Sequence, residues 1–255
     1  MPFSRTLAPA LLAFAICSAP LAASAQSFSD AQRGEIESII KNYLVTHPEV
    51  LEEASAELSK RQVAAEAAKH ANAVSANAQT IFNSPRGVTL GNQSGDVNFV
   101  EFFDYNCGYC KHAMGDMLNL LKTDPKLKVV LKEFPVLGPG SVEAAQVAVA
   151  ARMQDPGGKK YLDFHQKLLG GRGQADKARA LAAAKEAGLD VAKIEKDMNS
   201  PEVRATIEEN FKLAESMGMN GTPSYVIGKQ VVIGAVGLDT LKEKIGVARC
   251  GKATC

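Results

Sequence analysis

Two cysteines that lie two residues apart are the part of this sequence most able to do chemistry. They stand in "NCGYCKH", residues 106–112, where Cys107 and Cys110 enclose only Gly108 and Tyr109. This spacing suits a metal site, a structural disulfide or a redox-active dithiol. The other cysteines, the compartment and the surrounding elements have to distinguish these uses.

Metal binding and a purely structural bridge explain the pair less well than redox chemistry. A zinc site usually takes four ligands from paired Cys or His clusters. The only other late pair, Cys250 and Cys255, lies at the C-terminus, and no His-x-x-x-His motif completes the set. A disulfide that closes so short a loop as 107–110 constrains little of the unfolded chain. We therefore expect a redox pair and neither a metal nor another cofactor.

The elements around the pair favour the same reading. Residues 97–103 form a mostly apolar segment typical of a buried strand, and "CGYCKHAMGDMLNLLK" predicts a helix that begins at or just after Cys107. A sulfur at a helix start faces free backbone N–H groups, which lowers the thiol pKa. Cys107 is then the attacking thiolate, and Cys110, one turn along, resolves the mixed disulfide. Gly108 leaves the approach open, and Tyr109 adds no charge.

The rest of the chain after residue 85 predicts an α/β fold. The strand at 97–103 and the helix are followed by an apolar strand in "KLKVVLKEFPVLG", which gives a βαβ unit, and every periodic segment from Ser141 to about Met217 is helical. The remaining expected elements are a first strand at Val88–Leu90, two short strands around Gly228-Lys229-Gln230, and a last helix from Leu238 to about Ile245.

The N-terminal 25 residues read as a targeting segment. Arg5 precedes the apolar stretch "LAPALLAFAICSAPLA", which is short and interrupted by proline, and "ASA" before Gln26 is typical of a signal-peptidase site. A membrane anchor is the alternative. We expect residues 1–25, with Cys17, to be removed, and the protein to be secreted or periplasmic without membrane insertion.

Charge and cysteine count limit the partners. Without the targeting segment the chain has 28 basic and 28 acidic residues, so neither a nucleic acid nor an anionic membrane is an expected partner. The four remaining cysteines in an export pathway point to disulfide chemistry. Cys250 and Cys255 most simply bond to each other as a structural disulfide; a bridge to another chain, free thiols or a metal clip remain open.

The segment at 26–84 predicts a helical arm. Ser29-x-x-Gln32 is a candidate capping box, and a helix with one apolar stripe follows until His47-Pro48 interrupts it. From Val50 to about Ile81 the composition favours helix but offers few large side chains. Such a helix is either a solvated linker or an arm that packs against copies of itself as a homo-oligomer.

Two motifs carry a resemblance to a known family. "FVEFFDYNCGYCKHAM", followed much later by "GTPSYVIG", resembles the DsbA-type thioredoxin-like oxidoreductases, and "YLVTHPEVLEEASAELSKRQ" resembles the arm of the ScsC (suppressor of copper sensitivity protein C) branch. The resemblance covers about 88–247. It implies a thioredoxin fold at 85–255 with a helical insertion at about 141–217, and oligomerisation through the arm.

The resemblance also assigns roles beyond the two cysteines. Thr222 and Pro223 match the cis-proline loop, where a cis bond presents the Thr222 backbone to an extended substrate strand. Glu101 matches a buried acid that transfers protons for Cys110, and Lys132 matches a basic residue near that acid. Solvated charges at the edge of the sheet are the alternative for Glu101 and Lys132.

The expected function is thiol-disulfide exchange on unfolded or misoxidised exported proteins, with a membrane redox partner. Tyr109 stands where strongly oxidising members have His, so isomerase or reductase activity is favoured over a DsbA-like dithiol oxidase. A copper-binding or copper-tolerance module that uses the same two thiols is the alternative from another class.

Overall fold

The chain folds into two compact units. The computed structural model describes residues 28–255, so the expected signal peptide at 1–25 lies outside the described residues. The first unit ends at Leu58, and the second runs from Ser59 to Cys255. Within residues 28–255, no helix is both long and apolar enough to cross a membrane.

The first helices follow the local signals of the sequence. Helix α1 spans Asp30–Thr46, and the capping box is confirmed because the Ser29 hydroxyl accepts the Gln32 N–H while the Gln32 side chain accepts the Ser29 N–H. Helix α2 then spans Glu49–Ala76, directly after Pro48. No residue of α1 is buried, so its apolar stripe has no partner within the described chain.

The compact second unit begins earlier in the chain than the sequence suggests. Val74, near the end of α2, and Ile81, in helix α3 (Ala78–Asn83), are fully buried in one cluster with Phe102 and Leu213. Residues 59–84, which the sequence analysis assigned to the arm, therefore belong to the compact second unit. Few large side chains mark this stretch, but two of them complete the core.

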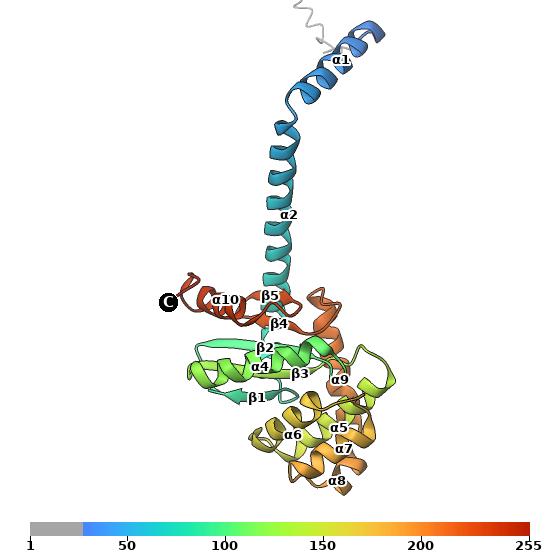
Figure 1. Ribbon diagram of the computed structural model, residues 1–255, viewed down its shortest axis with the longest axis vertical. Coiled ribbons are helices and arrows are strands. Elements are labelled where there is room, and N and C mark those ends of the chain that lie inside the picture. The colour runs from blue at the N-terminus through green and yellow to red at the C-terminus, as the bar shows by residue number, and fades with distance from the viewer. Residues whose placement is uncertain (1–27) are drawn as a thin grey trace, which may run out of the picture. The chain divides into compact units, whose positions relative to one another are not determined.

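Five strands form one mixed sheet in the order β1-β3-β2-β4-β5 (Figure 1). Strands β2 and β3 are parallel, and the other neighbouring pairs are antiparallel. The strands span Val88–Gly91 (β1), Val97–Phe103 (β2), Leu127–Glu133 (β3), Ser224–Ile227 (β4) and Gln230–Ile233 (β5). Although only a turn separates β1 from β2 along the chain, β1 pairs with β3, so that turn does not close a hairpin.

Alternation along β2 divides the core into two layers. Phe99 and Phe103 face the cluster that includes Met117 of helix α4 (Gly108–Thr123) and Leu241 of helix α10 (Leu238–Cys250). Phe102 belongs to the opposite cluster, with α3 and the end of helix α9 (Pro201–Ser216). The sheet is therefore covered on both faces, and α4 crosses one of them (Figure 1).

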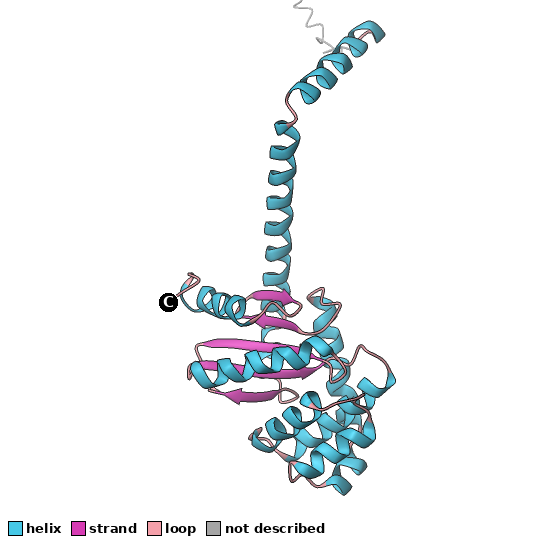
Figure 2. Cartoon of the chain, viewed as in Figure 1, coloured by secondary structure: helices cyan, strands magenta, loops and turns pink. Residues whose placement is uncertain are grey.

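The predicted helical insertion between β3 and β4 is confirmed. It contains only helices and loops (Figure 2), and α5 is rich in buried alanines that allow close packing. The helices span Pro139–Gln154 (α5), Lys159–Gly170 (α6), Lys177–Glu186 (α7), Val191–Asp197 (α8) and Pro201–Ser216 (α9). The last helix, α10, continues five residues beyond the expected end at Ile245, up to Cys250.

The buried position of Ile81 leads to a stability prediction. Ile81→Ala should lower the free energy of unfolding by about 2–5 kcal/mol, the usual range for removing a buried isoleucine side chain. Urea denaturation of the purified variant measures this loss. Val63→Ala is the control, because Val63 is exposed on α2 and its change should stay within about 0.5 kcal/mol. Equal effects of the two substitutions would show that Ile81 is not part of the core of the second unit.

Candidate active site

The two free cysteines lie at the start of α4, where the chain leaves β2. Cys107 is the N-cap residue, and its Sγ accepts the backbone N–H of Cys110 at 3.3 Å. Cys107 keeps 5% of its surface exposed, whereas Cys110 has none. Gly108 and Tyr109 between them are exposed, and nothing stands within 4 Å of the position a Gly108 side chain would take. Only Cys107 can therefore meet a large substrate directly.

The loop before β4 completes the site from the far end of the sequence. The peptide bond between Thr222 and Pro223 is cis. The Cys107 thiol lies 3.2 Å from the Thr222 carbonyl oxygen, to which it donates in its neutral form. The structure thus brings these two residues, more than a hundred positions away in sequence, against Cys107.

The pKa values of the two thiols are shifted in opposite directions. Hydrogen bonds from the side chains of Cys110 and Thr222 and from the backbone N–H groups of Cys110 and Tyr109 lower the pKa of Cys107 to about 6, against the opposing effect of burial. The pKa of Cys110 is raised, because its side chain hydrogen-bonds to Cys107 and because it is buried. Near neutral pH, Cys107 is therefore the thiolate and Cys110 keeps its proton.

A buried carboxyl group lies close to this pair. Glu101 is in the middle of β2, opposite Leu131 on β3 and Tyr225 on β4, and is 3% exposed. Burial raises its pKa to about 8, with a further contribution from the negative charges of Cys107 and Asp116. Glu101 in turn raises the pKa of Cys110. A group with this pKa can both take and give a proton near neutral pH.

Lys132 is not beside Glu101, which corrects the expectation that the two form a pair. The register between β2 and β3 sets Lys132 opposite Phe102, one residue further along, so it points to the other face of the sheet. Its Nζ lies 3.7 Å from a Glu209 carboxylate oxygen and 3.5 Å from Asn210 Oδ1 on α9. Burial lowers the pKa of this lysine, and its partner is Glu209.

Two residues just before Cys107 escaped the sequence analysis. The Asp104 carboxylate accepts three backbone N–H groups, from Asn106 at 2.7 Å, Val136 at 2.8 Å and Leu137 at 2.9 Å. Asn106 itself hydrogen-bonds to segments far along the chain. Both stand in the motif "FFDYNC", but polar residues before a helix usually indicate only a turn, so the pattern could not identify their partners.

The histidines lie outside the catalytic pair. His112 is exposed on α4. His165 is buried and lies 3.3 Å from the Tyr105 hydroxyl, and burial lowers its pKa to about 3. Tyr161 links this cluster to the buried Glu133, with 2.6 Å between its hydroxyl and the carboxylate. These groups form a hydrogen-bonded part of the core between β3 and α6.

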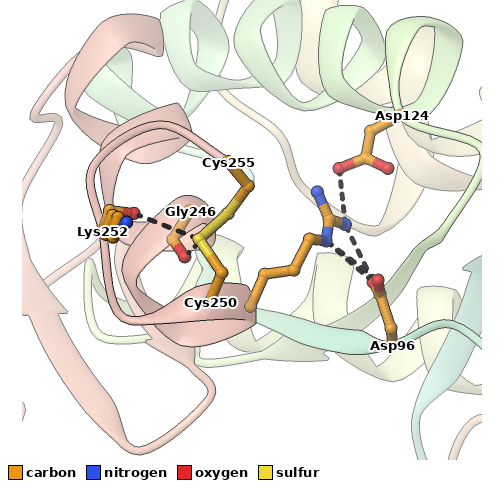
Figure 3. The surroundings of a disulfide bond; sticks show 7 residues. Asp96, Asp124, Gly246, Cys250, Lys252 and Cys255 are labelled. Carbon is orange, nitrogen blue, oxygen red and sulfur yellow. Dashed lines mark hydrogen bonds and ion pairs between the residues drawn. A yellow bond between two sulfur atoms is a disulfide. The ribbon is translucent and has the colours of Figure 1, made fainter.

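Cys250 and Cys255 are joined in a disulfide at the end of α10 (Figure 3). The neighbouring Arg249 forms ion pairs with Asp96, just before β2, and Asp124, just after α4. Because α4 has 16 residues, this end of the helix is roughly 24 Å from Cys107. The disulfide therefore closes the C-terminal tail and takes no part in the site at the opposite end of α4.

Within the described residues, no three His, Cys, Asp or Glu side chains are grouped as a metal ion would need. Cys107 and Cys110 together supply two sulfur ligands, and the second is a poor one because its pKa is raised. The arrangement suits attack on a disulfide, followed by resolution from within the protein.

Comparison with known proteins agrees with this geometry. Residues 99–246 match the DSBA-like thioredoxin domain, and residues 32–65 match the copper resistance protein ScsC N-terminal domain. A thioredoxin-like oxidoreductase from Silicibacter pomeroyi DSS-3 is 43% identical, with a TM-score of 0.64 over 67% of this chain and 96% of that chain. A linker-deletion mutant of Proteus mirabilis ScsC is 27% identical, with a TM-score of 0.65 over 88% of this chain and 98% of that chain.

The curated relatives are longer than the region they share with this chain. The match to the Na(+)/H(+) antiporter NhaA of Herminiimonas arsenicoxydans is 26% identical and covers 64% of this chain but only 26% of that protein. The match to the thiol:disulfide interchange protein DsbA of Bordetella pertussis is 26% identical and covers 52% of this chain and 64% of that protein. From its fold, its paired cysteines and the domain match over more than half its length, the chain belongs to the DSBA-like thioredoxin family, and it carries an ScsC-type N-terminal domain.

Proposed function

We propose that the protein is an exported thiol-disulfide oxidoreductase that acts on wrong or missing disulfides in other exported proteins. The observation that carries this proposal is the unequal pair at the start of α4, where Cys107, of low pKa and with a small exposed edge, stands beside the fully buried Cys110 of high pKa. The names of the matched relatives include a thiol:disulfide interchange protein, which supports the same chemistry.

The reaction starts with the Cys107 thiolate. Its sulfur attacks one sulfur of a substrate disulfide, forms a mixed disulfide and releases the other substrate sulfur as a thiolate. Cys110 then gives its proton to ionised Glu101 and attacks the Cys107 sulfur. The substrate leaves as a dithiol after protonation, two electrons have moved to it, and Cys107 and Cys110 are joined as a disulfide. In isomerisation, a second substrate thiolate attacks the mixed disulfide instead, and Cys107 returns with no net electron transfer.

Substrate binding is expected to use the backbone beside Cys107. The cis Thr222–Pro223 bond lies next to the sulfur and gives an extended chain a main-chain edge to pair with. Tyr109, Val136 and Leu137 are exposed apolar side chains, and the backbone of the last two is bound to Asp104, three residues before Cys107. Recognition of main chain and apolar surface would accept many unfolded sequences.

Within this activity we favour isomerisation or reduction over oxidation. Tyr109 cannot donate the charged hydrogen bonds of a protonated histidine, so the disulfide should be less oxidising than in DsbA. The stripe on α1 supports an oligomer, because Ile39 is 68% exposed and Ile36, Ile40 and Tyr43 are exposed beside it. Several catalytic domains in one assembly would raise the local concentration of thiols around a held substrate. A membrane redox partner would return the pair to its reduced state.

Copper binding is the second candidate, and the match of residues 32–65 to a copper resistance protein favours it. Cu(I) prefers two thiolates, and Cys107 and Cys110 could supply them. The raised pKa of Cys110 disfavours the doubly ionised pair, however. Titration of reduced protein with Cu(I), set beside its rate of insulin reduction, separates the two functions: tight binding without reduction supports the copper role.

The acidity of Cys107 can be tested directly. The alkylation rate of Cys107 should follow a thiolate with a pKa of about 6, because hydrogen bonds from the side chains of Cys110 and Thr222 stabilise the charge. Mass spectrometry after iodoacetamide treatment at a series of pH values measures it. Cys107→Ser should abolish insulin reduction, and Cys110→Ser should trap mixed disulfides. Equal alkylation of both thiols at every pH would contradict the assignment.

Glu101→Gln should raise stability and slow catalysis. The folded-state pKa of about 8 exceeds the ordinary carboxyl value of 4.5, so the folded protein retains a proton that the unfolded chain loses between these values. Stability therefore falls as pH rises from about 4.5 to 8, and glutamine removes that loss, which is up to a few kcal/mol. Resolution by Cys110 should slow about tenfold or more without the proton acceptor.

Thermal unfolding of the oxidised protein at pH 5 and pH 8 measures the stability effect, because Cys107 does not titrate as a disulfide. Single-turnover insulin reduction measures the rate. Asn98→Ala, a partly exposed polar position on the same strand, is the control for general damage to β2. An unchanged pH dependence of stability in Glu101→Gln would show that this carboxyl does not titrate as described.

The arm should control assembly and isomerisation. A chain that begins at Ser59 keeps the buried residues of α2 and α3, so it should fold as a monomer and still reduce insulin, but refold scrambled ribonuclease poorly. Light scattering gives the mass of both proteins. Ile39→Lys with Ile40→Lys in the full chain should have the same effect without a deletion. If the intact protein is monomeric at micromolar concentration and isomerises as well as the shortened chain, the arm is only a linker.

A further inference from the structure

The residue directly before the nucleophile is bound to the helical insertion by its side chain. Asn106 Nδ2 donates to the Ser141 hydroxyl at 2.9 Å and to the Ala175 carbonyl oxygen at 2.8 Å. Asn106 Oδ1 accepts the Ala175 N–H at 2.7 Å. All hydrogens of the amide and its carbonyl oxygen are therefore used, and the two bonds to Ala175 imitate the pairing of two strands.

These partners all belong to the insertion. Ser141 lies in the first turn of α5, and Ala175 lies in the segment that connects α6 to α7; both are buried. A second contact follows Cys107, because Lys111 Nζ donates to the Gly171 carbonyl oxygen at 3.0 Å. The insertion thus binds the chain on both sides of Cys107, at Asn106 before it and at Lys111 after it.

The backbone of the same loop is fixed as well. Asp104 accepts the Asn106 N–H, and the Cys107 N–H donates to the Asp104 carbonyl oxygen at 3.1 Å. The short loop between β2 and α4 is therefore constrained by its own turn and by Asn106. The bond from the Cys110 N–H to the Cys107 sulfur, at 3.3 Å, requires that this loop deliver the sulfur to one place.

We propose that Asn106 is a positioning residue that ties the loop of Cys107 to the helical insertion and so keeps the sulfur over the N-terminus of α4. The proposal rests on the proposed role of Cys107 as the nucleophile. It gives the insertion a part in the reaction, because its Ser141 and Ala175 set where the thiolate stands. Without the amide, the loop gains freedom, the sulfur spends less time beside the Cys110 N–H, and both its reactivity and the oxidising power of the disulfide fall.

The test compares Asn106→Ala with a control that loses the same kind of bonds elsewhere. The side chain of Gln154 makes an equivalent pair with the backbone of Asp190, donating to its carbonyl oxygen at 2.9 Å and accepting its N–H at 3.0 Å, also within the insertion but away from Cys107. Gln154→Ala should therefore reduce thermal stability without changing the nucleophile. Two quantities are measured for both variants. They are the alkylation rate of Cys107 at pH 6 and the equilibrium constant for reduction of the Cys107–Cys110 disulfide by glutathione.

In Asn106→Ala, the alkylation rate and the glutathione equilibrium constant should both fall by roughly three- to tenfold, the range that corresponds to one hydrogen bond. In Gln154→Ala both should equal those of the unchanged protein. If Asn106→Ala only loses thermal stability, as Gln154→Ala does, Asn106 is structural and the proposal is wrong.

Ser141→Ala gives a milder variant in case Asn106→Ala does not fold. It removes one of the three bonds and should shift both measurements in the same direction by a smaller factor; no shift in a folded Ser141→Ala, with Asn106→Ala unfolded, would also overturn the proposal. The alkylation rate of Cys107 in the unchanged protein distinguishes a failure of the proposed function from a failure of the positioning role of Asn106. If its Cys107 alkylates no faster than an ordinary thiol, the function fails; if only the variants show no effect, positioning fails alone.

Discussion

The hydrogen bond from the Cys110 N–H to the Cys107 sulfur is the interaction on which the rest of the site depends. It exists because Cys107 occupies the N-cap of α4, where backbone N–H groups have no partner within the helix. A sulfur that accepts such a group is stabilised as a thiolate. The strand before it and the loop that carries it bring the sulfur to that helix end, and the Thr222 carbonyl oxygen lies 3.2 Å from the sulfur.

Burial then makes the two thiols unequal. Cys110 is one turn further along α4 and faces the core, so its hydrogen bond to Cys107 and the loss of hydration on burial both favour its protonated form. Glu101 is in the same layer and has the same difficulty, which leaves its pKa close to neutral. Cys110 is the weaker acid of the two, so in the proposed reaction its proton moves to Glu101 only as the Cys110 sulfur attacks the mixed disulfide. A lysine in place of Glu101 would instead bring a positive charge to this site. The position of Lys132 on the other face keeps such a charge away.

The insertion and the arm extend this small site in different ways. The insertion holds the loop of Cys107 through Asn106, so helices that contribute no reacting atom still define its position. The end of α2 and all of α3 close the opposite layer of the sheet through Val74 and Ile81. The part of the arm before Ser59 has no buried side chain in the described chain, and its exposed apolar stripe is a surface that water disfavours.

Local signals in the sequence determined the elements and the chemistry of the site. The capping box at Ser29, the bounds of β2 and the start of α4 at Cys107 were predictable because each depends on residues within one or two turns. The family motifs supplied the cis-proline loop. What lay beyond reach were contacts set by the pairing of distant segments, since neither the spacing nor the composition records them.

The tertiary structure alone decided the partner of Lys132, the neighbour of β1 and the partners of Asn106. Whether Lys132 faces Glu101 depends on the register between β2 and β3, and a shift of one residue moves a side chain to the other face of a sheet. Asn106 reaches Ala175 only because a helical insertion folds back onto the active-site loop. The hydrophobic pattern specifies that a residue is buried, but the assembled layers determine what lies beside it.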